Sequence, residues 1–409
     1  MTKSQSRVKL ACYISNVCGA VIGNLPPLLF LTFRELYGIS FSLLGTLVLI
    51  NFFTQLIIDL IFSFFSHKFN IPATVRMMPV LTFVGLAIFA LTPWIFPNAI
   101  YGGLVLGTVI FSISSGLGEV LLSPIIAALP SKDPDRAMSA LHSIYAWGVV
   151  GVVILSTIYL QFVGNEHWQW LVFAYMLIPA VTATLYFTSE IPGMETPGRV
   201  SGVLEHMKNP TLWLCFFCIF LGGAAECTMA QWASGYLEAA LGIPKLWGDV
   251  FGVAMFGLAL GTGRTLYAKR GKNIENALFF GSIGAVICYF VAAVVNVPVI
   301  GLIACAFTGF CVSMLWPGSL IVGERKFPSG GVFIFAMMAA GGDMGASVGP
   351  QLIGIITDAA IAIPAISEAA ASMGLAPEQL GMKLGMLVGM LFPLCAIPLY
   401  ARVRKQLKK

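Results

Sequence analysis

The sequence contains twelve apolar stretches, each long enough to cross a lipid bilayer as a helix of about 20 residues. The chain is 58% hydrophobic and 10% charged, whereas soluble domains carry roughly 25% charged residues. In lipid, backbone polar groups must be satisfied within the spanning segment itself, which favours helices. We therefore predict an all-α integral membrane protein with spans near residues 9–33, 41–66, 73–96, 101–129, 137–163, 167–188, 211–236, 247–268, 274–296, 298–322, 330–358 and 380–402.

The basic residues test this arrangement, because cytoplasmic loops are enriched in lysine and arginine. With both termini in the cytoplasm, only Arg34, Lys245 and Lys383 of the 23 basic residues fall in outer segments. The net charge of +5 then reflects topology, and no nucleic-acid partner is expected. The chain has no Asn-x-Ser/Thr acceptor with x other than proline, which favours a bacterial inner membrane.

The chain divides into two similar halves. The longest connection, residues 189–210, follows the sixth span, so we predict six-helix bundles at 1–188 and 211–409 joined by a cytoplasmic linker. The connections after spans 2 and 8 are both short and basic, and contain Lys68 and Lys269. Two pseudo-symmetric halves of six spans are typical of the major facilitator fold, whose site lies near the bilayer midplane.

No catalytic or metal-binding motif fits its structural context. Gly345-Ala-Ser-Val-Gly349 matches a nucleophile elbow, but that elbow requires a strand before the serine, and here the motif lies in an apolar span. All nine cysteines fall in apolar stretches and read as small packing residues. We therefore expect neither an enzyme nor a cofactor.

Glu119 is the first candidate for handling an ion. Ser112, Ser115, Glu119 and Ser123 recur every three or four residues, so they form one polar stripe on an apolar helix. A carboxyl group inside the bilayer is costly and by default indicates function. We expect Glu119 to bind and release a coupling proton as its access to water changes, although a permanently protonated structural role stays open.

Glu226 is the second candidate, near the middle of the seventh span. Gln231, Trp232 and Tyr236 follow it, and we predict that all three bind substrate. On an unbroken helix Gln231 and Trp232 do not share the face of Glu226, so their convergence requires a broken helix. We predict that Glu226 contacts the substrate and shares in cation coupling.

Other polar and aromatic residues complete the predicted site. His142 is a further candidate for cation coupling, and Asp343 is a candidate ligand that packing alone also explains. Asp59, Lys68 and Arg264 are candidates for conformational gating. Aromatic faces stack on sugar rings, and amides and carboxylates bond to hydroxyl groups, so this mixture fits a neutral polyhydroxylated substrate better than a phosphate ester, which needs a deep arginine or lysine. The remaining predicted substrate-binding residues are Asn24, Tyr145, Trp147 and Trp316.

These residues lie in motifs that resemble the fucose–proton symporter group of the major facilitator superfamily. The motifs are Gly116-Leu-Gly118-Glu119 with Ser123-Pro124, Leu141-His142-x-x-Tyr145-x-x-Gly148, Gly223-Ala-Ala-Glu226, Gly263-Arg264, Trp316-Pro317 and Gly341-Gly-Asp343. The resemblance implies proton- or sodium-coupled sugar uptake with Glu119 as a coupling acid. Three positions depart from the group: Asn24 stands near the place of its acidic residue in span 1, His142 replaces its span 5 glutamine, and His67 replaces the superfamily's loop aspartate.

The leading hypothesis is cation-coupled symport of a sugar or related polar solute by alternating access, in a monomeric carrier surrounded by lipid. Proton coupling is expected, and sodium is the other possible ion. The alternative is an efflux antiporter for hydrophobic compounds or other metabolites. The 17 methionines and 30 phenylalanines would supply adaptable apolar surface for hydrophobic compounds.

Overall fold

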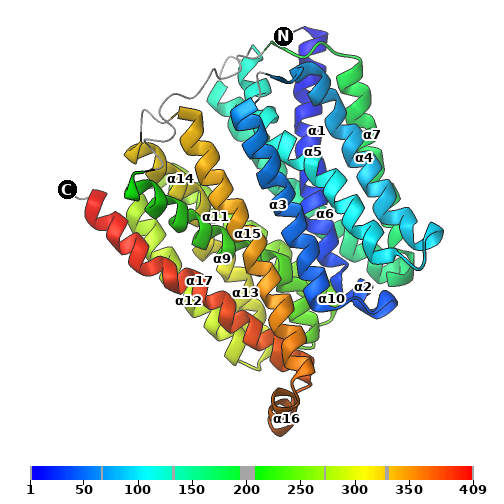
Figure 1. Cartoon of the computed structure of the whole chain (residues 1–409), viewed down its shortest axis with the longest axis vertical. Coiled ribbons are helices and arrows are strands. Elements are labelled where there is room, and N and C mark those ends of the chain that lie inside the picture. Colours follow the sequence, from blue (N-terminus) through cyan, green and yellow to red (C-terminus); the bar gives the residue numbers. More distant parts are fainter. Residues whose placement is uncertain are drawn as a thin grey trace. The chain divides into compact units, whose positions relative to one another are not determined.

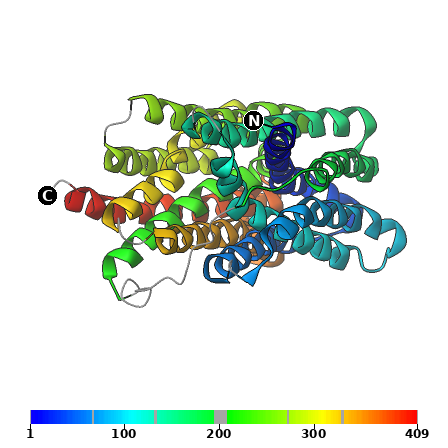
Figure 2. The same ribbon diagram turned by 90° about the horizontal axis from the view of Figure 1, so that it is seen from above.

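The computed structural model describes residues 2–65, 68–130, 134–193, 208–270, 273–327 and 331–407, and nearly all of them are helical. Figure 1 and Figure 2 show coiled ribbons and no strand arrows in this part of the chain. Within the described ranges, eleven helices are long and apolar enough to cross a membrane, and a shorter apolar helix covers Trp147–Val163. Each of the twelve predicted spans coincides with one of these helices, so the predicted helical membrane fold is confirmed.

Contacts divide the chain into two compact units. The first comprises Met1–Pro26 and Ile50–Ser201, and the second comprises Pro27–Leu49 and Gly202–Lys409. Residues 27–49 therefore pack with the second unit, although the residues before and after them in the chain belong to the first unit. Most of the predicted linker, residues 194–207, lies outside the described residues.

The first unit is built from helices that pack closely through small residues. In Figure 1, α4 lies beside α5 and α7, and these neighbours form its main contacts. Gly107 of α5 packs so closely on α4 that a methyl group there would meet the Gly85 carbonyl oxygen at 2.8 Å. The helices of this unit are α1 (Lys3–Leu28), most of α3 (Phe41–Phe65), α4 (Ile71–Ile95), α5 (Ile100–Ala128), α6 (Pro134–Val163), η2 (Asn165–His167) and α7 (Trp168–Phe187).

The second unit is organised around α9, which packs against α15, α17, α14 and α13. Asn209 caps its first turn by accepting a hydrogen bond from the Thr211 amide, and Pro210 follows, as helix starts favour. The helices are α2 (Phe30–Tyr37), the start of α3, α9 (Pro210–Ala239), α10 (Lys245–Trp247), η3 (Gly248–Ala254), α11 (Met255–Arg270), α12 (Ile274–Val294), α13 (Pro298–Val312), α14 (Leu315–Lys326), α15 (Gly331–Ala362), α16 (Pro364–Ser372) and α17 (Pro377–Leu407).

Two predicted spans are interrupted. The first is divided between α1 and α2 at Leu29, and the tenth between α13 and α14 at Ser313 and Met314. The seventh, by contrast, is the continuous helix α9. The helix break that would bring Gln231 and Trp232 onto the face of Glu226 is therefore absent from α9. The two side chains do not share the face of Glu226.

Candidate functional site

The first unit carries a second polar stripe that faces the one predicted on α5. Asn51, Gln55 and Asp59 recur every four residues on α3, so they share one face of that helix. The Ser112 hydroxyl of α5 donates to Asn51 Oδ1 at 2.6 Å, and Gln55 Nε2 donates to the same oxygen at 3.2 Å. The two stripes therefore meet in one buried hydrogen-bonded network.

A glycine allows the two helices to approach at this point. A methyl group at Gly116 of α5 would lie 3.0 Å from Ile58 Cβ and 3.1 Å from the Gln55 Cα atom. A larger residue would push α3 and α5 apart, because packed helices tolerate little added volume. Gly116 thus brings the next polar positions of both helices, Asp59 and Glu119, within reach of each other.

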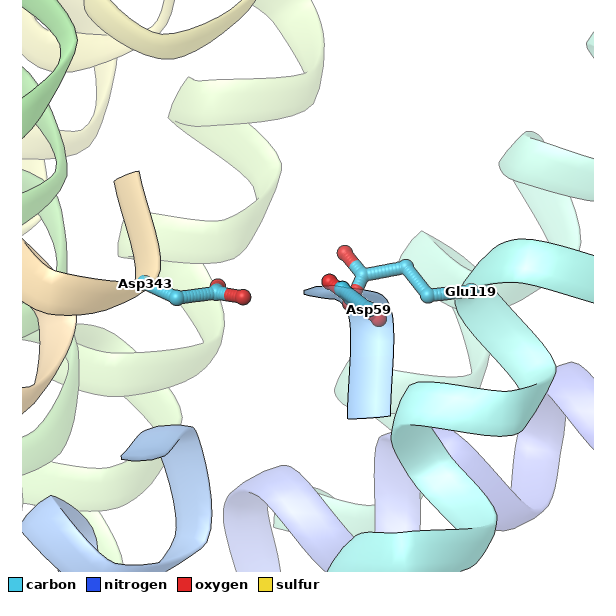
Figure 3. Close-up of side chains that lie close together, drawn as sticks. All are labelled: Asp59, Glu119 and Asp343. Atoms are coloured by element: carbon cyan, nitrogen blue, oxygen red, sulfur yellow. The ribbon is translucent and has the colours of Figure 1, made fainter. Parts of the chain in front are cut away.

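Asp59 and Glu119 form a pair of carboxylates. Figure 3 shows their side chains extending from α3 and α5 toward one another, and their oxygen atoms come within 4.8 Å. Asp59 is buried, whereas the Glu119 side chain is exposed. Two negative charges at this separation repel each other, so a proton or another cation bound between them relieves the repulsion.

The second unit pairs its carboxylate with a base instead. One terminal nitrogen of Arg264, on α11, donates to both carboxylate oxygens of Glu226, at 2.9 Å and 3.2 Å. The side chain of Glu226 is 14% exposed and that of Arg264 is 42% exposed. No basic residue lies near Glu226 in the sequence, but the long arginine side chain reaches it from another helix.

Pro317 helps to determine how the Arg264 side chain is oriented. Pro317 has no N–H group, so the Ser313 carbonyl, four residues earlier, cannot receive its usual helical hydrogen bond. Arg264 Nε donates to that carbonyl oxygen at 3.0 Å. The break between α13 and α14 thus creates an acceptor that orients the guanidinium group toward Glu226.

Trp316 lies beside this ion pair. Methyl groups at Gly223 of α9 and Gly342 of α15 would meet its ring at 3.0 Å and 2.6 Å, so the indole packs on both helices. Gly223 precedes Glu226 by three residues and shares its helix face. The structure therefore brings together Glu226, Arg264 and Trp316, and Asp343 follows Gly342 directly on α15, where Figure 3 shows its side chain.

Other predicted substrate ligands of the second unit are core residues. Trp232 is fully buried; its indole N–H donates to the Pro350 carbonyl at 2.8 Å, and its ring contacts Phe30 and Phe41. Tyr236 is also fully buried and donates to the Ala292 carbonyl. Gln231 is buried as well. Packing in the core is enough to explain why these three side chains are where they are. Their role in substrate binding stays a prediction.

The remaining predicted residues of the first unit, where the structure describes them, lie on several different elements. Tyr145 of α6 lies against Gly19 and Gly23 of α1, whereas Trp147, two positions later and therefore on another face, is 68% exposed. Asn24 donates to the Ala20 carbonyl one turn earlier. Lys68 is exposed and lies over the Phe65 ring. The side chains of His142 and Ser123, and all of His67, lie outside the described residues.

Two signals in the sequence could have revealed more of this arrangement. The α3 stripe has a helical spacing of four residues, close to that of the α5 stripe. Pro317 marks a carbonyl that needs a new donor. The Glu226–Arg264 pair had no such signal, because its partners are 38 residues apart and on different helices.

Comparisons with known proteins agree with this architecture. The sequence model of the Major Facilitator Superfamily matches residues 11–350. A comparison with curated protein sequences finds no match.

Three crystal structures of transporters share the fold. A bacterial homologue of the human lysosomal transporter Spinster, inward-facing and occupied, is 14% identical with a TM-score of 0.75, covering 99% of this chain and 98% of that one. A D-xylose–proton symporter is 15% identical with a TM-score of 0.68, covering 97% and 98%. The E. coli fucose:proton symporter is 15% identical with a TM-score of 0.60, covering 96% and 99%. At these identities the likeness establishes the fold alone.

Proposed function

Because the chain belongs to the major facilitator superfamily, and so is an integral membrane transporter rather than an enzyme, we propose that it is a proton-coupled symporter of a sugar or related small polar solute. It works by alternating access. Its setting is a bacterial inner membrane with both termini in the cytoplasm.

The observation that supports coupling is the Asp59–Glu119 pair. Two carboxylates within 4.8 Å, one buried and one exposed, form a site that favours a bound cation. The exposed Glu119 carboxyl is the group that exchanges a proton, and Asp59 supplies the charge that makes the bound proton favourable. The polar network of Asn51, Gln55 and Ser112 holds the two helices in register beside this pair.

The residue types near the two glutamates support a hydroxyl-rich solute. In the first unit, buried amides and a hydroxyl lie next to the carboxylate pair, and in the second, the Trp316 ring packs one helical turn from Glu226. Two of the structurally similar proteins are a D-xylose–proton and a fucose:proton symporter, which makes a sugar the first class to test.

The test is uptake by the purified chain in proteoliposomes with an alkaline interior. We expect accumulation of a labelled solute, chosen by thermal-shift screening against a sugar panel, that disappears when a protonophore collapses the pH gradient. A sodium gradient alone should not replace it. Glu119→Gln should lose accumulation, whereas Glu190→Gln, the same change on a residue outside the predicted spans, should keep it.

Two results would contradict this function. Normal accumulation by Glu119→Gln would remove Glu119 as the coupling acid. Proton-driven export of hydrophobic dyes, with no transport of polar solutes, would replace symport with the efflux alternative.

A further inference from the structure

The Glu226–Arg264 pair supplies a positive charge that a neutral sugar does not need. We propose that Arg264 binds a carboxylate group of the transported solute, and that Glu226 occupies this position when the solute is absent. The substrate is then an acidic sugar with a ring, such as a uronic acid. This inference rests on the proposed symport function and names its substrate class.

The guanidinium group is oriented for an acidic ligand. Arg264 Nε is bound to the Ser313 carbonyl oxygen, and one terminal nitrogen is bound to Glu226 at 2.9 Å and 3.2 Å. The planar guanidinium group can bind both oxygens of a carboxylate, whereas a sugar hydroxyl offers it a single oxygen. Glu226 already binds Arg264 through a carboxylate, which is the same group that we infer for the solute.

The arginine is also accessible. Its side chain is 42% exposed although it lies in a membrane-spanning helix, while its partner is 14% exposed. Among the contacts of the described residues, its other terminal nitrogen, Nη1, has no hydrogen-bond partner. A solute carboxylate can thus approach the open side of Arg264 before Glu226 leaves.

Protonation of Glu226 would complete the exchange. A neutral Glu226 no longer balances the charge of Arg264, and an unpaired charge in a membrane-spanning helix is costly. A solute carboxylate restores that balance. Binding of the acid and protonation of Glu226 therefore favour each other, which links the substrate to the proton.

Among the described residues, Arg264 forms the ion pair with Glu226. Two lysines near α9 have other partners. Lys245 of α10 pairs with Asp249 of η3 at 3.5 Å, and Lys383 of α17 donates to the Ala293 and Val295 carbonyls. Asp343 of α15 is buried. The basic residues Arg325 and Lys326 lie in the last turn of α14.

Trp316 supplies a surface for the rest of the solute. Its ring is partly exposed and packs at Gly223, one turn before Glu226 on the same face of α9. An aromatic face stacks on the C–H face of a sugar ring while the nearby arginine binds an acidic substituent. The two groups together therefore distinguish a sugar acid from a neutral sugar and from a small acid without a ring.

The experiment compares binding of matched probes to the full chain in detergent. The probes are two matched pairs of ring sugars, glucuronate with glucose and galacturonate with galactose. We expect the acids to raise the apparent melting temperature and the neutral sugars to have little effect, since only a ligand of the folded state stabilises it. Arg264→Gln should weaken acid binding about tenfold or more, as expected for the loss of a charge-assisted contact.

Two further variants keep the test decisive if Arg264→Gln folds poorly. Glu226→Gln leaves Arg264 in place without its competitor, so it should bind the acids at least as tightly at pH 8 as the unmodified chain does at pH 6. Arg76→Gln is the matched control, because Arg76 donates to the Tyr186 and Ser189 carbonyls in the first unit and should not affect binding.

The outcomes separate the two proposals. Equal binding of neutral sugars and acids, or full acid binding by Arg264→Gln, overturns the acidic-substrate inference and leaves sugar symport standing. Proton-driven accumulation of neutral sugars alone does the same. Absence of binding and transport for both probe classes overturns the proposed sugar symport and, with it, this inference.

Discussion

The two units place a glutamate in a membrane-spanning helix and give it opposite neighbours. In the first unit Glu119 lies within 4.8 Å of a second carboxylate, that of Asp59. In the second unit Glu226 is bound at 2.9 Å by the guanidinium group of Arg264. A like-charged neighbour favours uptake of a cation, whereas a positively charged neighbour forms an ion pair with the glutamate until another anion replaces it. Two glutamates in membrane-spanning helices therefore support different chemistry.

The local packing, by contrast, follows one rule in both units. Gly116 brings α5 close to α3 beside Asp59, and Gly223 brings α9 close to α15 and Trp316 beside Glu226. In each case a glycine three residues before the glutamate lets a neighbouring helix approach its face. The difference between the sites thus lies in the partner's charge rather than in how the helices meet.

The largest expected effect is the loss of coupling when the first pair is broken. Asp59→Asn and Glu119→Gln should each abolish gradient-driven accumulation while solute exchange across the membrane continues. Asp59→Asn should also raise the free energy of unfolding at pH 8 by about 1 kcal/mol, because it removes a like-charge repulsion. Uptake, counterflow and denaturant unfolding in detergent measure these effects; a destabilised Asp59→Asn variant would show that the pair is structural.

Breaking the Glu226–Arg264 pair should lower the free energy of unfolding rather than raise it. Arg264→Gln should lower the free energy of unfolding by about 1–2 kcal/mol, a value reduced because this side chain is partly exposed. The double variant Glu226→Gln/Arg264→Gln should recover part of this loss, because it leaves no unpaired charge. A double-mutant cycle measures the coupling, and strictly additive losses would contradict the ion pair.

The glycine contacts should differ in strength between the units. At Gly223 an added methyl group meets the Gly342 carbonyl oxygen at 2.6 Å, whereas at Gly116 it meets Ile58 Cβ at 3.0 Å. We expect Gly223→Ala to cost about 1–3 kcal/mol of unfolding free energy and Gly116→Ala less than that.

Gly102→Ala is the control for both, because nothing lies within 4 Å of an added methyl group there. It should be neutral or stabilising by up to about 1 kcal/mol, since alanine is the better helix former. Equal effects at all three glycines would show that helix propensity, rather than close packing, sets the result.

The smallest effects should separate core tryptophans from exposed ones. Trp232→Phe removes the hydrogen bond to the Pro350 carbonyl and should cost about 1 kcal/mol of stability without changing the KM for uptake. Trp147→Phe, at a 68% exposed position, should change stability by less than about 0.5 kcal/mol. A raised KM for Trp232→Phe would instead restore its predicted role in substrate binding.

The helices were predictable because their signals are local. Twelve apolar stretches predicted the spanning helices, and the spacing of Ser112, Ser115 and Glu119 predicted a polar face on α5. The same rule applies to Asn51, Gln55 and Asp59, so the second stripe was also present in the sequence. The sequence could not predict the role of a residue where that role depends on which other helix packs against it.

The sequence by itself determined the membrane-spanning class, the helices and the polar faces, because hydrophobicity and helical periodicity depend only on residue type and spacing. Only the tertiary structure decided which charges meet. Asp59 and Glu119 are 60 residues apart, and Glu226 and Arg264 are 38 apart, so each pairing depends on the approach of separate helices. Charge interactions fall off with distance, and a carboxylate's chemistry is therefore set by the few neighbours that folding places within several ångströms.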